Sequence, residues 1–469
     1  MDWDAIKKRV VDSWRPKEEG KPLERIVYSF LSYEQRQAIA LEERQRKMEE
    51  ERVAYEAQLA EAKKNEPAPF SVYNTDFQTR YAHTHVLGSP GSGKTQLLQS
   101  MILADLEREN RPTVVVVDSQ GDIIHKLRNL DLPFEPLYIN PRSPPSVNIF
   151  RVKNRGGDPE PSITAAIETL EYLFSGLGMD LSGKMKGLFK PMCRLMFSFD
   201  STLSDVIDFL DKPAAYKKHI DALPELPRKF FQTKMLGSGG PYKTTKDDIG
   251  HRVEALIHSP TFQKLLTEKE NTIDFYDELN KRQLILIDTD QAYLQGDDSK
   301  MFGRLFISLI LRAALERARV REQYRTPAFL YVDEAQEYFD QKTEHLLTQA
   351  RKYKLGVVLA HHFLNQTKGS LRDALMQCAI KLVSCPNFDD RTTMSKAMGT
   401  EYISRTPLTF TCATEGKIND VKVEYGLLES RPKRTHAPTA SNIVYSVPGR
   451  SSASSKKISK GVDSYGEDA

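Results

Sequence analysis

The segment from Gly88 to Thr95 has the residue types and spacing that point most directly to chemistry. It reads Gly88-Ser89-Pro90-Gly91-Ser92-Gly93-Lys94-Thr95 and matches the phosphate-binding loop pattern GxxxxGK[ST]. The glycines allow successive backbone N–H groups to turn inward around a β-phosphate, and the helix that follows adds its positive dipole end. We expect Lys94 to reach the β- and γ-phosphates and the Thr95 hydroxyl to ligate Mg²⁺. The loop therefore predicts a nucleotide site that takes ATP and Mg²⁺.

Two adjacent carboxylates form the second candidate group. Asp333 and Glu334 directly follow the apolar run Phe329–Val332, which places them at the carboxyl end of a buried strand. Beside a phosphate-binding loop, Asp333 would hold Mg²⁺ through water and Glu334 would act as the general base for an attacking water. This pair favours an ATPase over a kinase. The alternative is an acidic strand-to-helix turn without a catalytic role.

Histidine and arginine side chains near this pair supply further candidates. The next strand ends in His361 and His362, either of which could sense the γ-phosphate or could be hydrogen-bonded structure; we select His362. Arg351 closes the preceding helix. It could complement that helix dipole at the surface, or it could act as an arginine finger in a neighbour's site. Arg252 and Arg304 are rival fingers.

A parallel sheet must position these residues. Short apolar runs rich in β-branched residues alternate with longer amphipathic stretches, a pattern typical of an α/β fold with a sheet covered on both faces. The runs are Thr84–Leu87, Thr113–Asp118, Leu284–Asp288, Phe329–Asp333, Val357–Ala360 and Ile380–Ser384. After them, Leu408–Thr414 and Val421–Tyr425 flank a turn and predict a hairpin.

The domain organisation follows from breaks in this alternation. Residues 34–64 contain neither Gly nor Pro and are rich in charged helix formers, which predicts a solvated helix, a docking arm or a coiled coil. Ile163, Ile167 and Leu170 recur on one helical face where the strands pause. We predict an N-terminal helical arm (1–75), the ATPase core in two parts (76–154 and 281–428), an all-helical insertion (155–280) and a disordered basic tail (429–469).

Composition excludes several classes of protein. The 469-residue chain has a net charge of only +3, and residues 430–460 hold seven Lys/Arg without Asp/Glu, so the body is faintly acidic. The four cysteines lie far apart and predict neither a disulfide framework nor a zinc site. No apolar run approaches the roughly 20 residues of a membrane span. We expect a soluble, cytoplasmic protein.

Taken in order along the chain, these motifs resemble the HerA–FtsK superfamily of DNA-pumping ATPases. Within it, they are most similar to the TraD/TraG coupling proteins of type IV secretion. The segments that carry the resemblance are Gly88–Thr95, Val114–Asp122, Asn140-Pro141, Asn148, Leu284–Asp288, Asp333–Gln336, Ala350–Tyr353, Ala360–His362 and Gln366. An all-helical insertion after the second strand is also a feature of the coupling proteins.

The resemblance implies a RecA-like fold and a ring, a homo-hexamer, with double-stranded DNA bound without sequence preference in its channel. ATP would lie between subunits, which gives an arginine finger its target. Two features depart from the family: His362 stands where glutamine is usual, and a polar helix replaces the N-terminal membrane anchor. We therefore expect a soluble relative that could bind a partner protein through its N-terminal arm.

Two other readings remain open. Asp333–Gln336 also resembles a motif of superfamily-1 helicases, which would require a second RecA-like domain. A non-motor switch or scaffold could bind ATP and recruit partners through its helical arm and basic tail. Contacts to DNA are the weakest prediction: Lys368 and Arg372, beyond the strand that ends in His362, could bind phosphates or could simply be solvated.

Overall fold

The computed structural model describes residues 46–47, 49–50, 72–151, 153, 155, 158–176, 180–236, 242–339, 347, 349–367 and 369–434. The chain divides into two units, Met1–Pro69 and Phe70–Ala469. The few described residues of the first unit are helical. Most of the predicted N-terminal arm, residues 435–469 of the predicted tail, and Lys368 lie outside the described residues.

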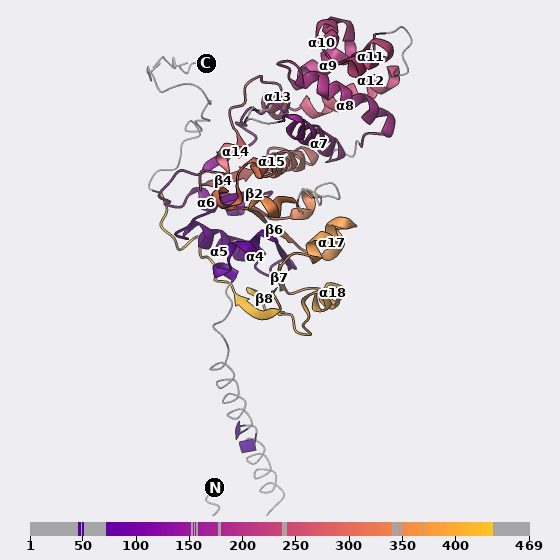
Figure 1. Ribbon diagram of the computed structural model, residues 1–469. Helices are drawn as coiled ribbons and strands as arrows, with labels where there is room; N and C mark the ends of the chain where they lie inside the picture. Colours follow the sequence, from indigo (N-terminus) through magenta and orange to yellow (C-terminus); the bar gives the residue numbers. More distant parts are fainter. Residues whose placement is uncertain are drawn as a thin grey trace, which may run out of the picture. The chain divides into compact units, whose positions relative to one another are not determined.

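A mixed, mostly parallel sheet forms the centre of the second unit (Figure 1). In the described residues it has nine strands in the order β3-β4-β2-β5-β6-β1-β7-β8-β9. The strands are β1 (Thr84–Gly88), β2 (Thr113–Asp118), β3 (Leu137–Ile139), β4 (Leu284–Asp288), β5 (Ala328–Val332), β6 (Leu355–His361), β7 (Ile380–Ser384), β8 (Thr409–Thr414) and β9 (Lys417–Lys422). Strands β1 to β7 pair in parallel. The predicted α/β class is confirmed.

Side chains of the parallel strands alternate between two apolar cores, because both faces of the sheet are covered by helices. In β2, Val115 and Val117 enter one core, and Val114 and Val116 enter the other. The first core includes α7 (Glu160–Gly176) and α15 (Asp297–Glu316). The second includes α4 (Phe77–Tyr81), α5 (Lys94–Leu106) and α6 (Asp122–Arg128). Burial on both faces explains why these strands are almost continuously apolar.

Helices, and no strand, occupy the described residues between β3 and β4. They are α7, α8 (Gly183–Phe197), α9 (Leu203–Asp211), α10 (Lys217–Asp221), α11 (Glu225–Lys234), α12 (Lys243–Ile257), α13 (Pro260–Leu266) and α14 (Phe275–Glu278), with the short η2 (Pro213–Tyr216). Figure 1 shows α8 to α12 stacked together beyond α7, away from the sheet. Side-chain caps begin three of them: Ser182 accepts from Met185 N at α8, Thr202 and Asp205 form a capping box at α9, and Asp274 accepts from Tyr276 N at α14. The helices follow a third strand, β3, rather than the second.

The predicted hairpin forms, but its second strand begins earlier than the sequence pattern indicates. Glu415 and Gly416, with φ of 47° and 76°, make a two-residue turn, so Lys417 already pairs with Thr414. Strand β9 is largely exposed and polar, with Val421 its buried residue. An edge strand of this kind has too few apolar positions to mark its start.

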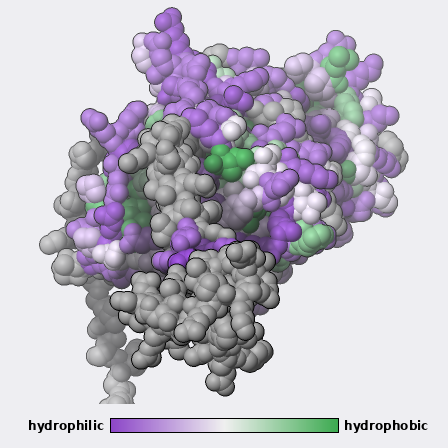
Figure 2. All heavy atoms as spheres, turned by 90° about the horizontal axis from the view of Figure 1, so that it is seen from below, coloured by the Kyte–Doolittle hydropathy of each residue, from purple (hydrophilic) through white to green (hydrophobic). Residues whose placement is uncertain are grey.

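The described surface is mainly polar. Figure 2 shows hydrophilic side chains over most of one face, with hydrophobic ones in small separate groups. None of the helices in the described residues combines the length and apolar character that a membrane span needs.

Candidate active site

The strand order brings the predicted site residues, apart from Arg351, to one edge of the sheet. Strand β6 lies between β5 and β1. The carboxyl ends of these parallel strands therefore place the Asp333/Glu334 pair, the end of β6 and the phosphate-binding loop side by side. This edge is where ligands bind in open α/β sheets.

The loop between β1 and α5 has the backbone of a phosphate cradle. Gly91 and Gly93 have φ of +77° and +96°, a region that other residues adopt only with strain. A Cβ atom on Gly88 would lie 2.4 Å from Ser92 Oγ, and one on Gly93 would lie 2.6 Å from Leu408 Cδ2. Ser92 Oγ is buried and has no hydrogen-bond partner among the described residues. A phosphate oxygen would supply one.

Lys94 is held inside the site at the start of α5. Its side chain is buried, and Nζ donates to Gly88 O at 3.0 Å and lies 2.6 Å from His362 Nδ1. Burial lowers the pKa of Lys94, an effect that Asp333 and Glu334 oppose. A partly desolvated ammonium group of this kind gains from a phosphate ligand.

The acidic pair lies directly opposite. Asp333 Oδ2 accepts from Thr95 Oγ1 at 3.4 Å, and burial, with Asp118 and Glu334, raises the pKa of Asp333 to about 7. Glu334 has a left-handed backbone (φ 51°), and its N–H donates to Asp333 Oδ1 at 3.0 Å. Strain of this kind is typical of functional turns. Gln336 Nε2 donates to Glu334 Oε2 at 2.7 Å and fixes that carboxylate.

The acidic residues fit a divalent cation that also has phosphate ligands. No group of three or more His, Cys, Asp or Glu side chains able to hold a metal occurs in the described part of the chain. Thr95 and Asp333 supply two oxygen ligands, and Mg²⁺ ordinarily takes few protein ligands and completes its shell with water and substrate phosphates. The buried charge of Asp333 would be neutralised by such an ion.

His362 connects Lys94 to the acidic pair. Its Nε2 lies 2.7 Å from Glu334 Oε1, while Nδ1 faces Lys94 Nζ. Because an ammonium group can only donate, Nδ1 accepts and Nε2 carries the proton toward Glu334. The structure thus gives an ordered chain from Lys94 through His362 to Glu334.

His361 points elsewhere, into the sheet. It is buried, and its Nε2 lies 2.7 Å from His85 Nε2 with the two rings stacked at 4.9 Å and 6°. Burial lowers the pKa of His361 to about 4 and that of His85 well below its ordinary value. Of the two adjacent histidines, only His362 lies at the site.

The candidate arginines are spread over the molecule. Arg351 is exposed in η6 (Arg351–Tyr353), just before the amino end of β6, so it lies at the opposite edge of the sheet from Lys94. Arg304 donates from Nε to Glu337 O at 3.4 Å, and Arg252 donates to Asp248 O at 2.7 Å. A role for Arg351 requires a neighbouring subunit and stays a prediction.

Sequence reasoning gave no definite role to several residues that support the site. Asp118 accepts from Gln120 N at 3.0 Å and Ile123 N at 2.9 Å, and its charge contributes to the raised pKa of Asp333. Gln366 Oε1 accepts from the backbone N–H of His362 at 3.0 Å and so orients that histidine. Gln336 and Gln366 were visible only as members of motifs.

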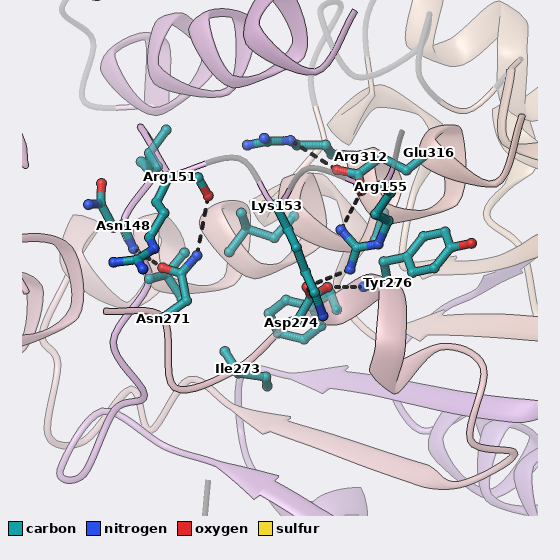
Figure 3. Close-up of a pocket in the computed structure, with 15 residues that line it drawn as sticks. Asn148, Arg151, Lys153, Arg155, Asn271, Ile273, Asp274, Tyr276, Arg312 and Glu316 are labelled. Atoms are coloured by element: carbon teal, nitrogen blue, oxygen red, sulfur yellow. Dashed lines mark hydrogen bonds and ion pairs between the residues drawn. The ribbon is translucent and has the colours of Figure 1, made fainter. Parts of the chain in front are cut away.

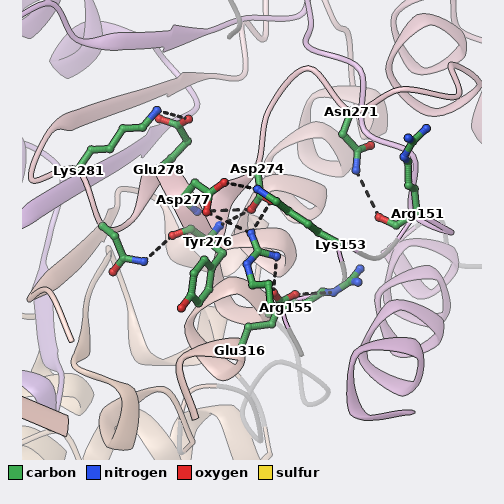
Figure 4. Close-up of polar contacts among 12 residues, drawn as sticks. Arg151, Lys153, Arg155, Asn271, Asp274, Tyr276, Asp277, Glu278, Lys281 and Glu316 are labelled. Carbon is green, nitrogen blue, oxygen red and sulfur yellow. Dashed lines mark hydrogen bonds and ion pairs between the residues drawn. The ribbon is translucent and has the colours of Figure 1, made fainter. Parts of the chain in front are cut away.

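A second polar cluster lies away from this site. Figures 3 and 4 show Arg155 directed at acidic side chains beside a small cavity. Arg155 binds Asp274 Oδ2 at 2.5 Å and Glu316 Oε2 at 3.2 Å, and Lys153 Nζ binds Asp277 Oδ2 at 2.7 Å. Each of these cations is already paired with a carboxylate, so the cluster fastens the chain after β3 to α14 and α15.

The strand order, the phosphate cradle and the convergent carboxylates define a RecA-like P-loop NTPase fold. A family model described as the type IV secretion-system coupling protein DNA-binding domain matches residues 73–141. That stretch carries β1, the phosphate-binding loop and α5. Comparison with curated proteins gives no match.

Solved structures share this fold. The bacterial conjugative coupling protein TrwBΔN70, in an unbound form, is 14% identical, with 80% of this chain and 92% of that chain covered and a TM-score of 0.51. TrwB in complex with ADP and Mg²⁺ is 14% identical over 77% and 90% of the two chains (TM-score 0.50). VirB4 of Thermoanaerobacter pseudethanolicus is 14% identical over 76% and 92% (TM-score 0.52). The predicted resemblance to the type IV secretion coupling proteins is confirmed, in the fold and in the family match to residues 73–141.

Proposed function

We propose that this protein binds ATP with Mg²⁺ and hydrolyses it. The observation that carries the proposal is the convergence of Lys94, Glu334 and His362 within hydrogen-bond distance at the phosphate-binding loop. A solved structure of similar fold is described as a complex with ADP and Mg²⁺. Burial and the unpartnered Ser92 hydroxyl fit a phosphate ligand.

Each site residue has a defined part in the proposed reaction. Lys94 and the loop N–H groups hold the β- and γ-phosphates, while Thr95 and Asp333 would hold Mg²⁺, which neutralises developing phosphate charge. Water attacks the γ-phosphorus, the bond to the leaving ADP oxygen breaks, and Glu334 accepts the proton of the water.

His362 connects phosphate binding to the base. In the structure, both oxygens of Glu334 accept hydrogen bonds, one from His362 and one from Gln336. When Lys94 turns to the phosphates, Nδ1 of His362 loses its donor and the imidazole is free to move toward the γ-phosphate. Release of Glu334 from His362 leaves one oxygen available to the water.

Hydrolysis, we propose further, drives the movement of DNA through a ring of identical subunits. The matched family is described by its DNA-binding domain, and TrwB is described as a conjugative coupling protein. Arg351 is exposed at the opposite edge of the sheet, where a subunit could present it to its neighbour's site. A homo-hexamer with DNA in its channel, and a protein partner for the N-terminal arm, are parts of this proposal.

The test is the ATPase rate of the full chain with and without double- and single-stranded DNA, with the oligomer mass measured alongside. We expect DNA to stimulate turnover and the active species to be a closed oligomer. ATP turnover by a monomer, at a rate that neither form of DNA changes, would contradict the proposed motor function.

A non-motor ATP-dependent switch is the second candidate, and such DNA-independent turnover would favour it. The helicase alternative lacks support, because the described residues of the second unit form one sheet rather than two RecA-like domains.

A further inference from the structure

The strand order also fixes which way a bound nucleotide must run. Its γ-phosphate end is set by Glu334 and His362, which follow β5 and β6 on one side of β1. The α-phosphate and nucleoside therefore leave the loop on the other side, toward β7 and β8, over the first turn of α5. The residues on that side decide what contacts the base.

The segment Val423–Gly426, which follows β9, is hydrogen-bonded to the first turn of α5 and, through Leu408, to the phosphate-binding loop. Leu408 N donates to Ser92 O at 2.9 Å, and Leu408 covers Gly93. Val423 N donates to Leu408 O at 2.8 Å. Gly426 N then donates to the side-chain oxygen of Gln96, the residue after Thr95, at 2.9 Å. The chain beside Gly426 thus lies next to the phosphate-binding loop.

Tyr425 stands in this segment, one peptide bond from the residue that Gln96 holds. Its side chain is 77% exposed, so its ring is open to a ligand. An exposed ring beside the nucleoside end of the site offers a flat surface for a base, since aromatic side chains stack on bases of any sequence. Leu408 supplies apolar surface nearby.

We propose that Tyr425 is the stacking platform for the nucleobase, and that Gln96 is a positioning residue that holds it there. The inference rests on the proposed nucleotide site and adds to it the recognition of the base. Because stacking uses the face of the ring system and not its edge, the platform treats ATP and GTP alike.

The test compares Kd values for ATP, GTP and inorganic tripolyphosphate, a ligand that has the phosphates but no base. We expect Tyr425→Ala to weaken ATP and GTP binding roughly tenfold, the size of a lost stacking contact, and to leave tripolyphosphate binding unchanged. Tyr425→Phe should bind all three like the parent protein. Tyr324→Ala is the matched control, because Tyr324 is 67% exposed but lies in η4 (Glu322–Tyr324), at the amino edge of the sheet.

Gln96→Ala tests the positioning role. It should raise the KM for ATP several-fold with little change in kcat, because the platform is displaced while the catalytic groups stay in place. Tripolyphosphate binding should again be unchanged.

The outcomes separate this proposal from the one it rests on. A Tyr425→Ala protein that binds ATP like the parent overturns the platform, as does an equal loss of ATP and tripolyphosphate binding. If that variant keeps ATP affinity but loses affinity for single-stranded DNA, Tyr425 serves the nucleic acid instead. A parent protein that binds neither ATP nor tripolyphosphate contradicts the nucleotide site itself.

Discussion

The two ends of helix α5 carry two buried charge clusters that differ in how their charges are satisfied. At the carboxyl end of α5, Asp105 forms a bidentate ion pair with Arg80. Arg80 Nη2 lies 2.9 Å from Asp105 Oδ2. Tyr331 OH bonds both partners at 2.7 Å, and Arg80 lies 3.9 Å above the ring of Phe329. Although burial opposes its charge, Asp105 and Tyr331 hold the pKa of Arg80 above its ordinary value.

At the start of the same helix, burial outweighs the stabilising contacts of the charged groups. Burial lowers the pKa of Lys94 and raises that of Asp333 to about 7. Both groups are thus held where their charged forms are disfavoured, which is costly unless a ligand supplies the missing charge. One end of α5 thus has the charge balance of a stabilising ion pair, and the other has the charge balance expected of the proposed site for a metal-bound triphosphate.

The largest change in stability is expected when the Arg80–Asp105 ion pair is broken. Arg80→Met leaves the buried Asp105 with only the partly exposed Arg108, 3.4 Å away, as a counter-charge and should lower the free energy of unfolding by about 3–5 kcal/mol. Urea unfolding measures this change. Arg431→Met is the control, because Arg431 forms a partly exposed ion pair with Glu107 at 2.9 Å, whose loss should cost about 1 kcal/mol or less. Equal losses in the two variants would contradict the structural role of the pair.

Removing the buried carboxylate of Asp333 should instead raise the stability of the protein. Asp333→Asn should stabilise the nucleotide-free protein by about 2 kcal/mol near neutral pH, because it deletes a buried charge, and should abolish stabilisation by MgATP. Thermal unfolding with and without MgATP measures both effects. Asp131→Asn, at an exposed aspartate, is the control. A destabilised Asp333→Asn protein would show that this charge is already compensated.

The pH dependence of this variant follows from the same shift. The folded protein holds the Asp333 proton up to about pH 7, whereas the ordinary pKa is 3.8. Between these values the folded state binds more protons than the unfolded state, so this group makes stability fall as pH rises. The difference in stability between parent and Asp333→Asn should grow across that window.

An effect confined to acid pH is expected at the buried histidines behind the site. The pKa of His361 is about 4 in the folded protein against an ordinary 6.5, so its contribution to stability is present above pH 6.5 and is lost as pH falls toward 4. His361→Phe should reduce this acid destabilisation by roughly 1–3 kcal/mol. His251→Phe, at an exposed histidine, is the control. Parallel pH profiles for parent and His361→Phe would contradict the assignment.

The fold and the core of the site could be predicted because their signals are local. The phosphate-binding loop is a contiguous motif, and Asp333 and Glu334 are placed by the apolar strand that precedes them. No sequence pattern explains why His362 and not His361 lies at the site, since that depends on which face of β6 turns toward His85. Nor could it show the Arg80–Tyr331 contact, which joins residues 251 positions apart. The start of β9 was misplaced because an exposed edge strand lacks an apolar pattern.

The proposed hydrolysis requires Lys94 and Glu334 to act on one triphosphate. One paired measurement tests this requirement: ATP binding and ATP turnover of Lys94→Ala and Glu334→Gln beside the parent protein. We expect Glu334→Gln to keep the parent affinity for ATP and to lose turnover by roughly 10²–10⁴-fold, while Lys94→Ala loses ATP binding itself. Hydrolysis by Glu334→Gln at the parent rate, or undiminished ATP binding by Lys94→Ala, would contradict the account.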